Sequence, residues 1–188
     1  MTAAAALRRS YPQEISCNGK ALVLRRLAAS DRAVLRDFVT TLSEQDLMFL
    51  RIDITNETVM DQWIAGQDGE DWITILALEG KRIVGYGTLH RDAMSWTRHL
   101  GEIRVIVGSE YRGSGLGGLL TREIFELARE LGLSKVVARM PLRQEGARRM
   151  FEKLGFHAEA LLADWVIDRD DRTQDLVIMS YDVTGLTD

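Results

Sequence analysis

The chain has 188 residues, a formal net charge of -4, 46% hydrophobic residues and a single cysteine, Cys17. This length and apolar content are typical of one globular domain, and the basic residues form no stripe that would indicate a nucleic-acid partner. One cysteine excludes an internal disulfide and fits a reducing compartment, so we expect a cytoplasmic protein. No apolar run reaches the length of a membrane span, and no Cys/His cluster has metal-ligand spacing. The negative charge slightly favours a cationic substrate such as an amine.

Hydrophobic periodicity predicts alternating strands and helices along most of the chain. The segment 1–20 has the character of a loose leader, followed by a single domain over 21–183. Period-2 patterns predict strands at 21–27, 72–80, 82–92, 102–107, 135–140 and two more between 156 and 183. Apolar positions at helical spacing predict helices at 31–42, 43–50, 57–65, 116–131 and 144–154. Ser30 is a suitable N-cap for the first of these helices.

This order of elements predicts an α/β fold, with a mixed sheet and helices on both faces. The strands at 72–80, 82–92 and 102–107 follow one another closely and are most simply an antiparallel meander, with a turn at Glu79-Gly80-Lys81. The strand at 135–140 is reached by a crossover helix, so we expect it to run parallel to its neighbour. The central strand–helix–strand unit is therefore the part expected to bind a ligand.

A glycine-rich turn follows the strand at 102–107 and leads into the helix at 116–131. Glycines let the backbone approach a ligand, and a helix start presents unpaired N–H groups with a partial positive charge. An anion, most simply a pyrophosphate, is the expected ligand. Gly113, Gly115 and Gly118 match the dinucleotide fingerprint G-x-G-x-x-G, but that turn normally follows the first strand and needs an acid about 20 residues later. Neither condition holds, and no Lys-Ser/Thr pair of a P-loop follows.

The turn resembles the acetyl-CoA signature of the GNAT N-acetyltransferase superfamily. The pattern Gln/Arg-x-x-Gly-x-Gly/Ala is met by Arg112, Gly115 and Gly117. The helix ending FEKLGF is similar to a second family feature, and the element order agrees over about 21–183. The stretches EIRVIVGSEYRGSGLG and LSEQDLMFLR also resemble the bacterial protein-lysine acetyltransferase branch. The resemblance implies a GNAT-like, mostly antiparallel sheet with a splayed strand pair at the cofactor site.

The resemblance also implies acetyl-CoA as co-substrate, no metal, and a primary-amine acceptor. A lysine side chain of a protein is the first expected acceptor, and a small-molecule amine is the second. The pyrophosphate would bind the turn amides, and the pantetheine arm would pair with the preceding strand, where an amide near Val107 would polarise the thioester carbonyl. The cofactor-binding residues implied in this way are Val105, Ile106, Val107, Arg112, Gly113, Ser114, Gly115, Leu116, Gly117, Gly118, Gln144 and Phe151.

Glu102 is the candidate general base, since it begins the strand at a position where relatives often hold a glutamate. An ordinary solvent-exposed glutamate is the competing interpretation. The family's proton-donating tyrosine is replaced by Phe151, and the usual asparagine by Gln144, which keeps an amide. Because phenylalanine cannot donate a proton, a non-catalytic acyl-CoA-binding sensor is the alternative function. Exposed strands near the C-terminus also allow a homodimer.

Overall fold

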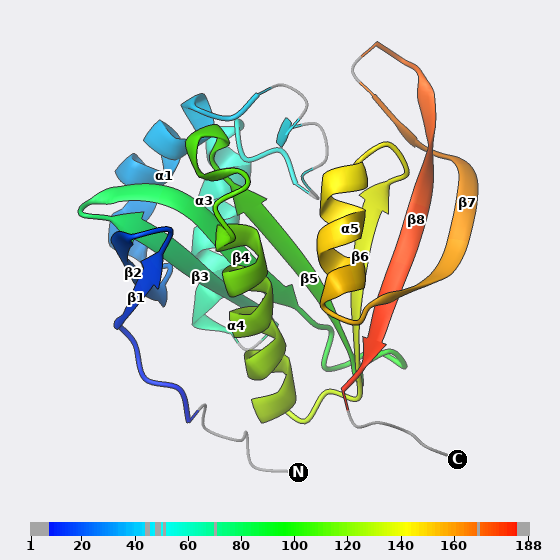
Figure 1. Cartoon of the computed structure of the whole chain (residues 1–188), viewed down its shortest axis with the longest axis horizontal. Helices are drawn as coiled ribbons and strands as arrows, with labels where there is room; N and C mark the ends of the chain where they lie inside the picture. The colour runs from blue at the N-terminus through cyan, green and yellow to red at the C-terminus, as the bar shows by residue number, and fades with distance from the viewer. Residues whose placement is uncertain are drawn as a thin grey trace.

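The computed structural model describes residues 8–43, 46–47, 50, 52–69, 71–168 and 170–183. These residues form one eight-stranded sheet with helices on both faces (Figure 1). The strands lie in the order β1-β2-β3-β4-β5-β6-β8-β7. The strands are β1 (Gln13–Cys17), β2 (Lys20–Arg26), β3 (Trp72–Glu79), β4 (Arg82–His90), β5 (Leu100–Val107), β6 (Lys135–Pro141), β7 (His157–Ile167) and β8 (Thr173–Asp182). The α-helices described are α1 (Arg32–Thr40), α3 (Glu57–Ala65), α4 (Leu116–Glu130) and α5 (Glu145–Lys153).

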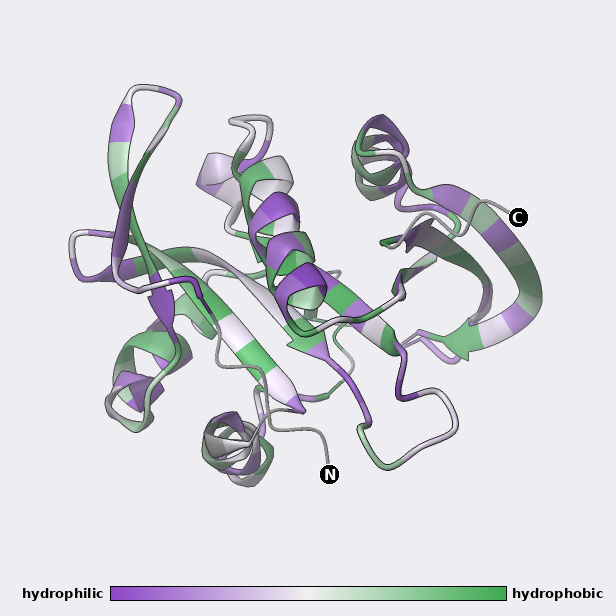
Figure 2. Cartoon of the chain, turned by 90° about the horizontal axis from the view of Figure 1, so that it is seen from below, coloured by the Kyte–Doolittle hydropathy of each residue, from purple (hydrophilic) through white to green (hydrophobic). Residues whose placement is uncertain are grey.

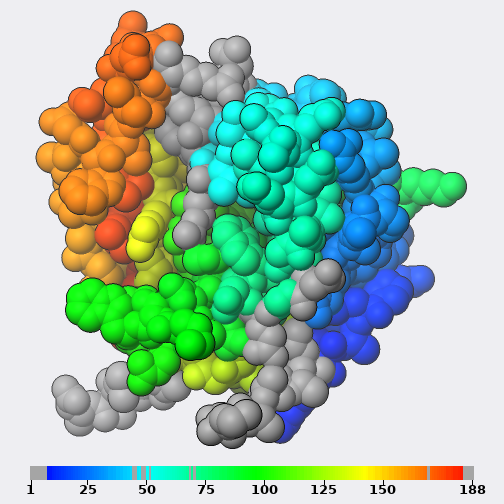
Figure 3. Space-filling model, turned by 180° about the vertical axis from the view of Figure 1, so that it is seen from behind, coloured from blue at the N-terminus to red at the C-terminus, as the bar shows by residue number. Residues whose placement is uncertain are grey.

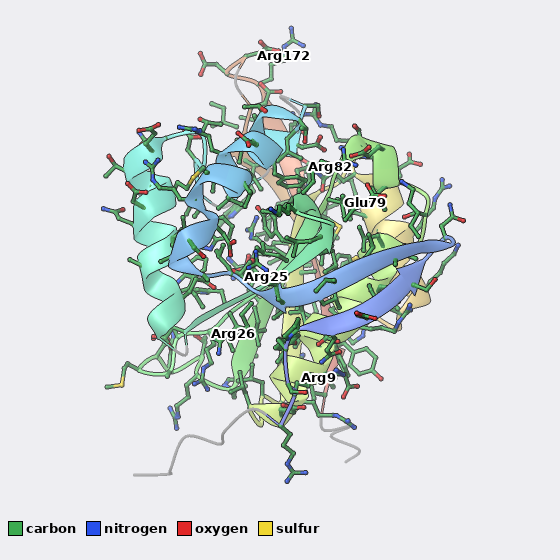
Figure 4. All side chains as sticks on the ribbon, turned by 90° about the vertical axis from the view of Figure 1, so that its left-hand side faces the viewer. Arg9, Arg25, Arg26, Glu79, Arg82 and Arg172 are labelled. Carbon is green, nitrogen blue, oxygen red and sulfur yellow. The ribbon has the colours of Figure 1, made fainter. Side chains whose placement is uncertain are left out.

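Every neighbouring strand pair is antiparallel except β5 and β6, which are parallel. The expected meander, the parallel crossover strand and the mixed α/β sheet are thus confirmed. The turn between β3 and β4 is also confirmed, with Gly80 at a φ of +60°. Glu79 and Arg82 flank this turn and form an ion pair at 2.7 Å (Figure 4).

The sheet separates two layers of the hydrophobic core, and each layer is covered by helices. Helices α4 and α5 cover one face of the sheet, and α1 and α3 cover the other, with hydrophilic residues on their outer sides (Figure 2). Leu120 and Ile124 of α4 are fully buried against the sheet. Gly87 of β4 permits this close packing, because a Cβ atom there would lie only 2.6 Å from Cγ1 of Ile124. The glycine therefore sets how closely α4 approaches the sheet.

Strands β5 and β6 separate soon after they begin. Their pairing covers Leu100–Glu102 of β5 against Lys135–Val137 of β6. Beyond Glu102, β5 remains paired with β4 on its other side, up to Val107 opposite Gly85. The splayed strand pair that the family resemblance implied is therefore present, and it leaves one edge of β5 open.

Two local expectations differ from the structure. Residues 13–17, which the sequence placed in a loose leader, form β1 and pair with β2, so the ordered fold begins earlier. Ser30 does not cap α1, because Asp31 occupies the N-cap position after a 3-10 turn at Ala29–Asp31. The helix expected over 43–50 lies partly outside the described residues. Among the described residues, no helix is long and apolar enough to cross a membrane.

The ion pair at the start of α1 supports an acid-stability prediction. Arg25 donates to both carboxylate oxygens of Asp31 at 2.5 and 2.6 Å, and the Ala28 amide donates at 2.9 Å. Burial raises the pKa of Asp31, but these hydrogen bonds and the Arg25 charge outweigh it, so the pKa is lowered overall. Asp31→Asn should therefore reduce the free energy of unfolding at pH 7 by about 2–3 kcal/mol, because it removes one partner of a largely buried pair.

A lowered pKa means that this stabilisation is fully present above the unfolded pKa of about 3.9 and is lost as pH falls below it. Urea unfolding at pH 7 and pH 3 checks the prediction, since the difference between wild type and Asp31→Asn should shrink at pH 3. Exposed Asp37 on the same helix supplies the control variant, Asp37→Asn. A difference that stays constant with pH would contradict the assignment.

Candidate active site

The glycine turn adopts a backbone conformation that few other residues accept. Gly113 has a φ of +73°, and Gly115, the N-cap of α4, has a φ of +91°. Ser114 braces the turn, because its hydroxyl donates to the Tyr111 carbonyl at 2.6 Å and accepts from the Leu116 amide at 3.3 Å. A Cβ atom at Gly113 or Gly115 would meet nothing within 4 Å. The glycines are therefore required by backbone conformation and face open space.

The first turn of α4 directs backbone amides into this space. Gly117 and Gly118 are the second and third residues of α4, so their N–H groups have no acceptor in a preceding helical turn. Both residues line the adjoining cavity. A Cβ atom at Gly117 would lie 3.0 Å from Sδ of Met150, so this glycine also lets α5 approach α4 closely. The helix start thus has the amides and the partial positive charge of an anion site.

The open edge of β5 begins beside this turn. The Gly108 amide donates to the Val84 carbonyl at 2.9 Å and continues the β4–β5 ladder. Because alternate residues of an antiparallel strand point their backbone groups to opposite edges, Val105 and Val107 direct theirs away from β4. Strand β6 has already separated on that side. An extended, amide-bearing molecule fits such an edge as an additional strand would.

One cavity of about 870 Å³ connects the turn, the open strand edge and the face covered by α3. In Figure 3 the hairpin β7–β8 (orange) and helix α3 (teal) stand on either side, with β5 and β6 between them. Of the sequence-predicted site residues, those that line this cavity are Val105, Ile106, Val107, Arg112, Gly113, Gly115, Gly117, Gly118, Gln144 and Phe151. The structure thus brings most of the predicted cofactor residues to one site.

Ser114, Leu116 and Glu102 are the described candidates that do not line the cavity. Ser114 supports the turn from behind, and Leu116 is fully buried in the core, with its amide bonded to the Ser114 hydroxyl. Phe151 is 5% exposed and packs edge-on against Phe156, with ring centroids 4.9 Å apart. Phe151 is therefore both a core residue and part of the cavity wall.

Glu102 lies at the border of the cavity, on the α1 and α3 side of the sheet. Strand alternation puts its side chain on the same face as those of Arg104 and Ile106, and Ile106 packs against the α1–α3 core. The Arg104 guanidinium donates to Oε1 of Glu102 from Nε at 3.1 Å and from Nη2 at 2.8 Å. The Glu102 side chain is 11% exposed, and Arg104 lines the cavity. The Glu102 carboxylate is thus bonded to a residue that lines the cavity and is largely shielded from solvent.

The cavity is basic although the whole chain is acidic. Its described lining contains the carboxylate of Asp46 and six basic side chains, which are Arg104, Arg112, Arg122, Arg139, Arg149 and Lys153. Asp46 pairs with Arg112 at 2.5 Å. Burial raises the pKa of Asp46, but hydrogen bonds from Ser43 and Arg112 outweigh it and lower the pKa overall. The formal net charge of -4 therefore does not predict the charge of the cavity, whose basic lining favours anions.

Sequence reasoning missed several cavity residues. On α5, Arg149 lines the cavity and its neighbour Arg148 does not. Arg122 and Arg139 also line it, although their charges gave no sequence signal because they come from different elements. The wall on the α3 side contains Leu50, Ile52, Ile54, Trp63, Trp72, Tyr86 and Thr88. Trp63, Trp72, Tyr86 and Thr88 were visible in the sequence only as members of periodic helices and strands.

Comparisons with known proteins agree with this geometry. The model of the acetyltransferase (GNAT) family matches residues 37–156, more than half of the chain. N-acetyltransferase 8 of Rattus norvegicus is 29% identical over 124 residues, covering 62% of this chain and 51% of the relative. N-acetyltransferase 8 of Mus musculus is 30% identical over 99 residues, covering 50% and 44%. The chain therefore spans only about half the length of these curated relatives.

Solved structures share the fold at low identity. A GNAT-family acetyltransferase from Streptococcus pneumoniae has a TM-score of 0.74 at 23% identity, covering 85% of this chain and 98% of that one. A phosphinothricin acetyltransferase from Sinorhizobium meliloti, solved with acetyl-CoA, has a TM-score of 0.74 at 20% identity, covering 86% and 88%. Together with the family match, the glycine turn and the splayed strands, these likenesses place this chain in the GNAT family of acetyltransferases.

Proposed function

We propose that the protein is an acetyl-CoA-dependent N-acetyltransferase that transfers an acetyl group to a primary amine by direct attack. The observation that carries this proposal is the open edge of β5 beside the glycine turn, within one cavity. The turn supplies anion-binding amides, and the strand edge supplies a place for an amide-bearing arm. A dinucleotide has no amide-bearing arm of this kind that would pair with an open strand edge.

The residues present fit the cofactor. The amides of Gly117 and Gly118, with the charges of Arg112 and Arg122, would hold the pyrophosphate. The backbone of Val105–Val107 would bind the pantetheine arm, and the Gln144 amide lies along the same cavity. When bound, acetyl-CoA supplies an acetyl group activated as a thioester. An outward amide near Val107 would donate a hydrogen bond to its carbonyl oxygen and stabilise the charge that develops there.

Glu102 is the proposed general base. An unperturbed lysine-type amine has a pKa near ~10.4, so most of it is protonated at neutral pH and cannot attack. Because Glu102 lies behind Arg104 at the cavity border, we propose that it takes the proton through a water molecule. No proton donor stands at Phe151, and the departing thiolate is a stable enough anion to leave unprotonated. The acceptor is a primary amine, from a protein lysine or from a small molecule.

Thermal unfolding with acetyl-CoA gives a direct test. At about 100 times its Kd, a ligand specific for the folded state adds about 2.7 kcal/mol. For a domain of this size we expect the Tm to rise by about 5–10 °C with acetyl-CoA and not to change with NAD. The reverse pattern would refute the proposal. Release of free CoA in the presence of an amine panel then separates an enzyme from an acyl-CoA sensor.

A further inference from the structure

The β1–β2 hairpin contacts the glycine turn from outside the cavity. It lies beside the start of α4 (Figure 1), and neither Cys17 of β1 nor Lys20 of β2 lines the cavity. Cys17 is 2% exposed, and its thiol donates to the Ser114 carbonyl at 3.5 Å. The Ser114 hydroxyl lies 3.5 Å from the same sulfur atom. The hairpin therefore contacts the turn at the residue that stands between Gly113 and Gly115.

Lys20 holds the residue that stands immediately before the turn. Its Nζ donates to the Tyr111 hydroxyl at 3.3 Å and lies 4.7 Å from the centroid of the Tyr111 ring. Glu79 of β3 fixes the lysine in turn, with its Oε1 3.0 Å from Nζ. Hydrogen bonds from Arg82, Tyr111 and Lys20 lower the pKa of Glu79 to about 2, so this carboxylate is ionised at neutral pH. Lys20 thus connects both hairpins, β1–β2 and β3–β4, to the start of the turn.

The glycine turn depends on contacts from outside itself, because its glycines do not fix its conformation. Gly113 and Gly115 both have positive φ and have no side chain that could pack against the fold. Glycine also loses more conformational freedom on ordering than any other residue. A turn that becomes ordered only when the ligand binds loses affinity, whereas a turn that is already ordered does not. Contacts that fix Ser114 and Tyr111 should therefore strengthen binding at the amides of the turn.

We propose that Cys17 and Lys20 are positioning residues for the cofactor, which hold the glycine turn in the conformation that binds the pyrophosphate. This inference rests on the proposed acetyltransferase function. Cys17 fixes Ser114 within the turn, and Lys20 fixes Tyr111 just before it. Because neither side chain lines the cavity, both act on the cofactor through the turn. The β1–β2 hairpin is then part of the cofactor site, although it supplies no direct contact.

Three ligands distinguish support of the turn from a general loosening of the fold. CoA has the pyrophosphate and a 3′-phosphate, dephospho-CoA has only the pyrophosphate, and pantetheine has neither. Titration calorimetry measures the Kd of each ligand for wild type, Cys17→Ala and Lys20→Met. We expect each variant to raise the Kd of CoA and of dephospho-CoA about 3- to 10-fold, which corresponds to the loss of one hydrogen bond. The Kd of pantetheine should change by less than about 2-fold.

Two further variants serve as controls. Cys17→Ser keeps a donor beside the Ser114 carbonyl and should remain within about 2-fold of wild type for all three ligands. Lys81→Met is matched to Lys20→Met, because Lys81 is an exposed lysine of the β3–β4 turn outside the cavity lining. It should leave every Kd unchanged.

Hydrogen exchange of the free protein gives a second measurement that requires no ligand. The Leu116 amide donates to the Ser114 hydroxyl at 3.3 Å, so it reports on the turn. In Cys17→Ala this amide should exchange faster than in wild type, while the amide of Ile124 within α4 should exchange at the wild-type rate.

Wild-type Kd values for CoA in both variants, or equal losses for CoA and pantetheine, would overturn the inference and leave the acetyltransferase function intact. An unchanged exchange rate at Leu116 in Cys17→Ala would contradict the role of Cys17. If wild type itself binds neither CoA nor acetyl-CoA, the proposed function fails rather than the role of the hairpin.

Discussion

Replacing Gly115 with valine should abolish measurable acetyl-CoA binding and lower kcat/KM at least 100-fold. Gly115 is the N-cap of α4 with a φ of +91°, a region that a β-branched residue occupies only with strain of about 1–3 kcal/mol. Relief of that strain turns the amides of Gly117 and Gly118 away from the cavity. The new side chain also projects into the open space where the pyrophosphate is proposed to bind.

Gly132, just beyond the other end of α4, provides the matched control. It also has a positive φ, +70°, and a Cβ atom there would meet nothing within 4 Å. Gly132→Val should therefore lose a similar amount of stability while retaining the rise in Tm with acetyl-CoA, since it lies outside the cavity lining. If Gly115→Val binds acetyl-CoA as tightly as wild type does, the pyrophosphate does not bind at this turn.

Glu102→Gln should lower kcat about 10²- to 10⁴-fold at neutral pH, the usual contribution of a general base. Binding of acetyl-CoA should be unchanged, because Glu102 lies away from the turn and outside the cavity lining. The deficit should shrink as pH rises toward the amine pKa near ~10.4, since more of the amine is then neutral without help from a base. Steady-state kcat from about pH 7 to 10, with acetyl-CoA saturating, measures this.

The control for this experiment is Glu126→Gln on α4, where the glutamate pairs with Arg129 at 2.6 Å outside the cavity lining. Its pH–rate profile should match that of wild type. If Glu102→Gln also retains the wild-type profile, Glu102 is a structural partner of Arg104 and another group accepts the proton. If Glu102→Gln loses acetyl-CoA binding, the substitution has disturbed β5, and the loss of rate would not identify a base.

Local sequence patterns were sufficient for most of the elements and for the anion-binding turn. The strand at 135–140 and the helix at 57–65 coincide closely with β6 and α3, because a buried face imposes period 2 or 3.6 within one element. The glycines at 113 and 115 were equally readable, since a positive φ is a property of one residue and its neighbours. Such features depend on residues adjacent in the chain, and the anion-binding turn followed directly from them.

The cavity wall on the α3 side depended on contacts between distant elements. In the sequence, Tyr86 has only the pattern of an ordinary strand residue. The fold places Arg104 of β5 near it and packs Trp63 of α3 against its ring. Arg149 rather than Arg148 lines the cavity because the rotation of α5 against α4 decides which side chain turns inward. The basic lining likewise gathers charges from separate strands and helices, which a chain with a net charge of -4 does not reveal. The glycine turn is thus encoded locally, whereas the cavity wall on the α3 side exists only once the sheet and its helices have packed.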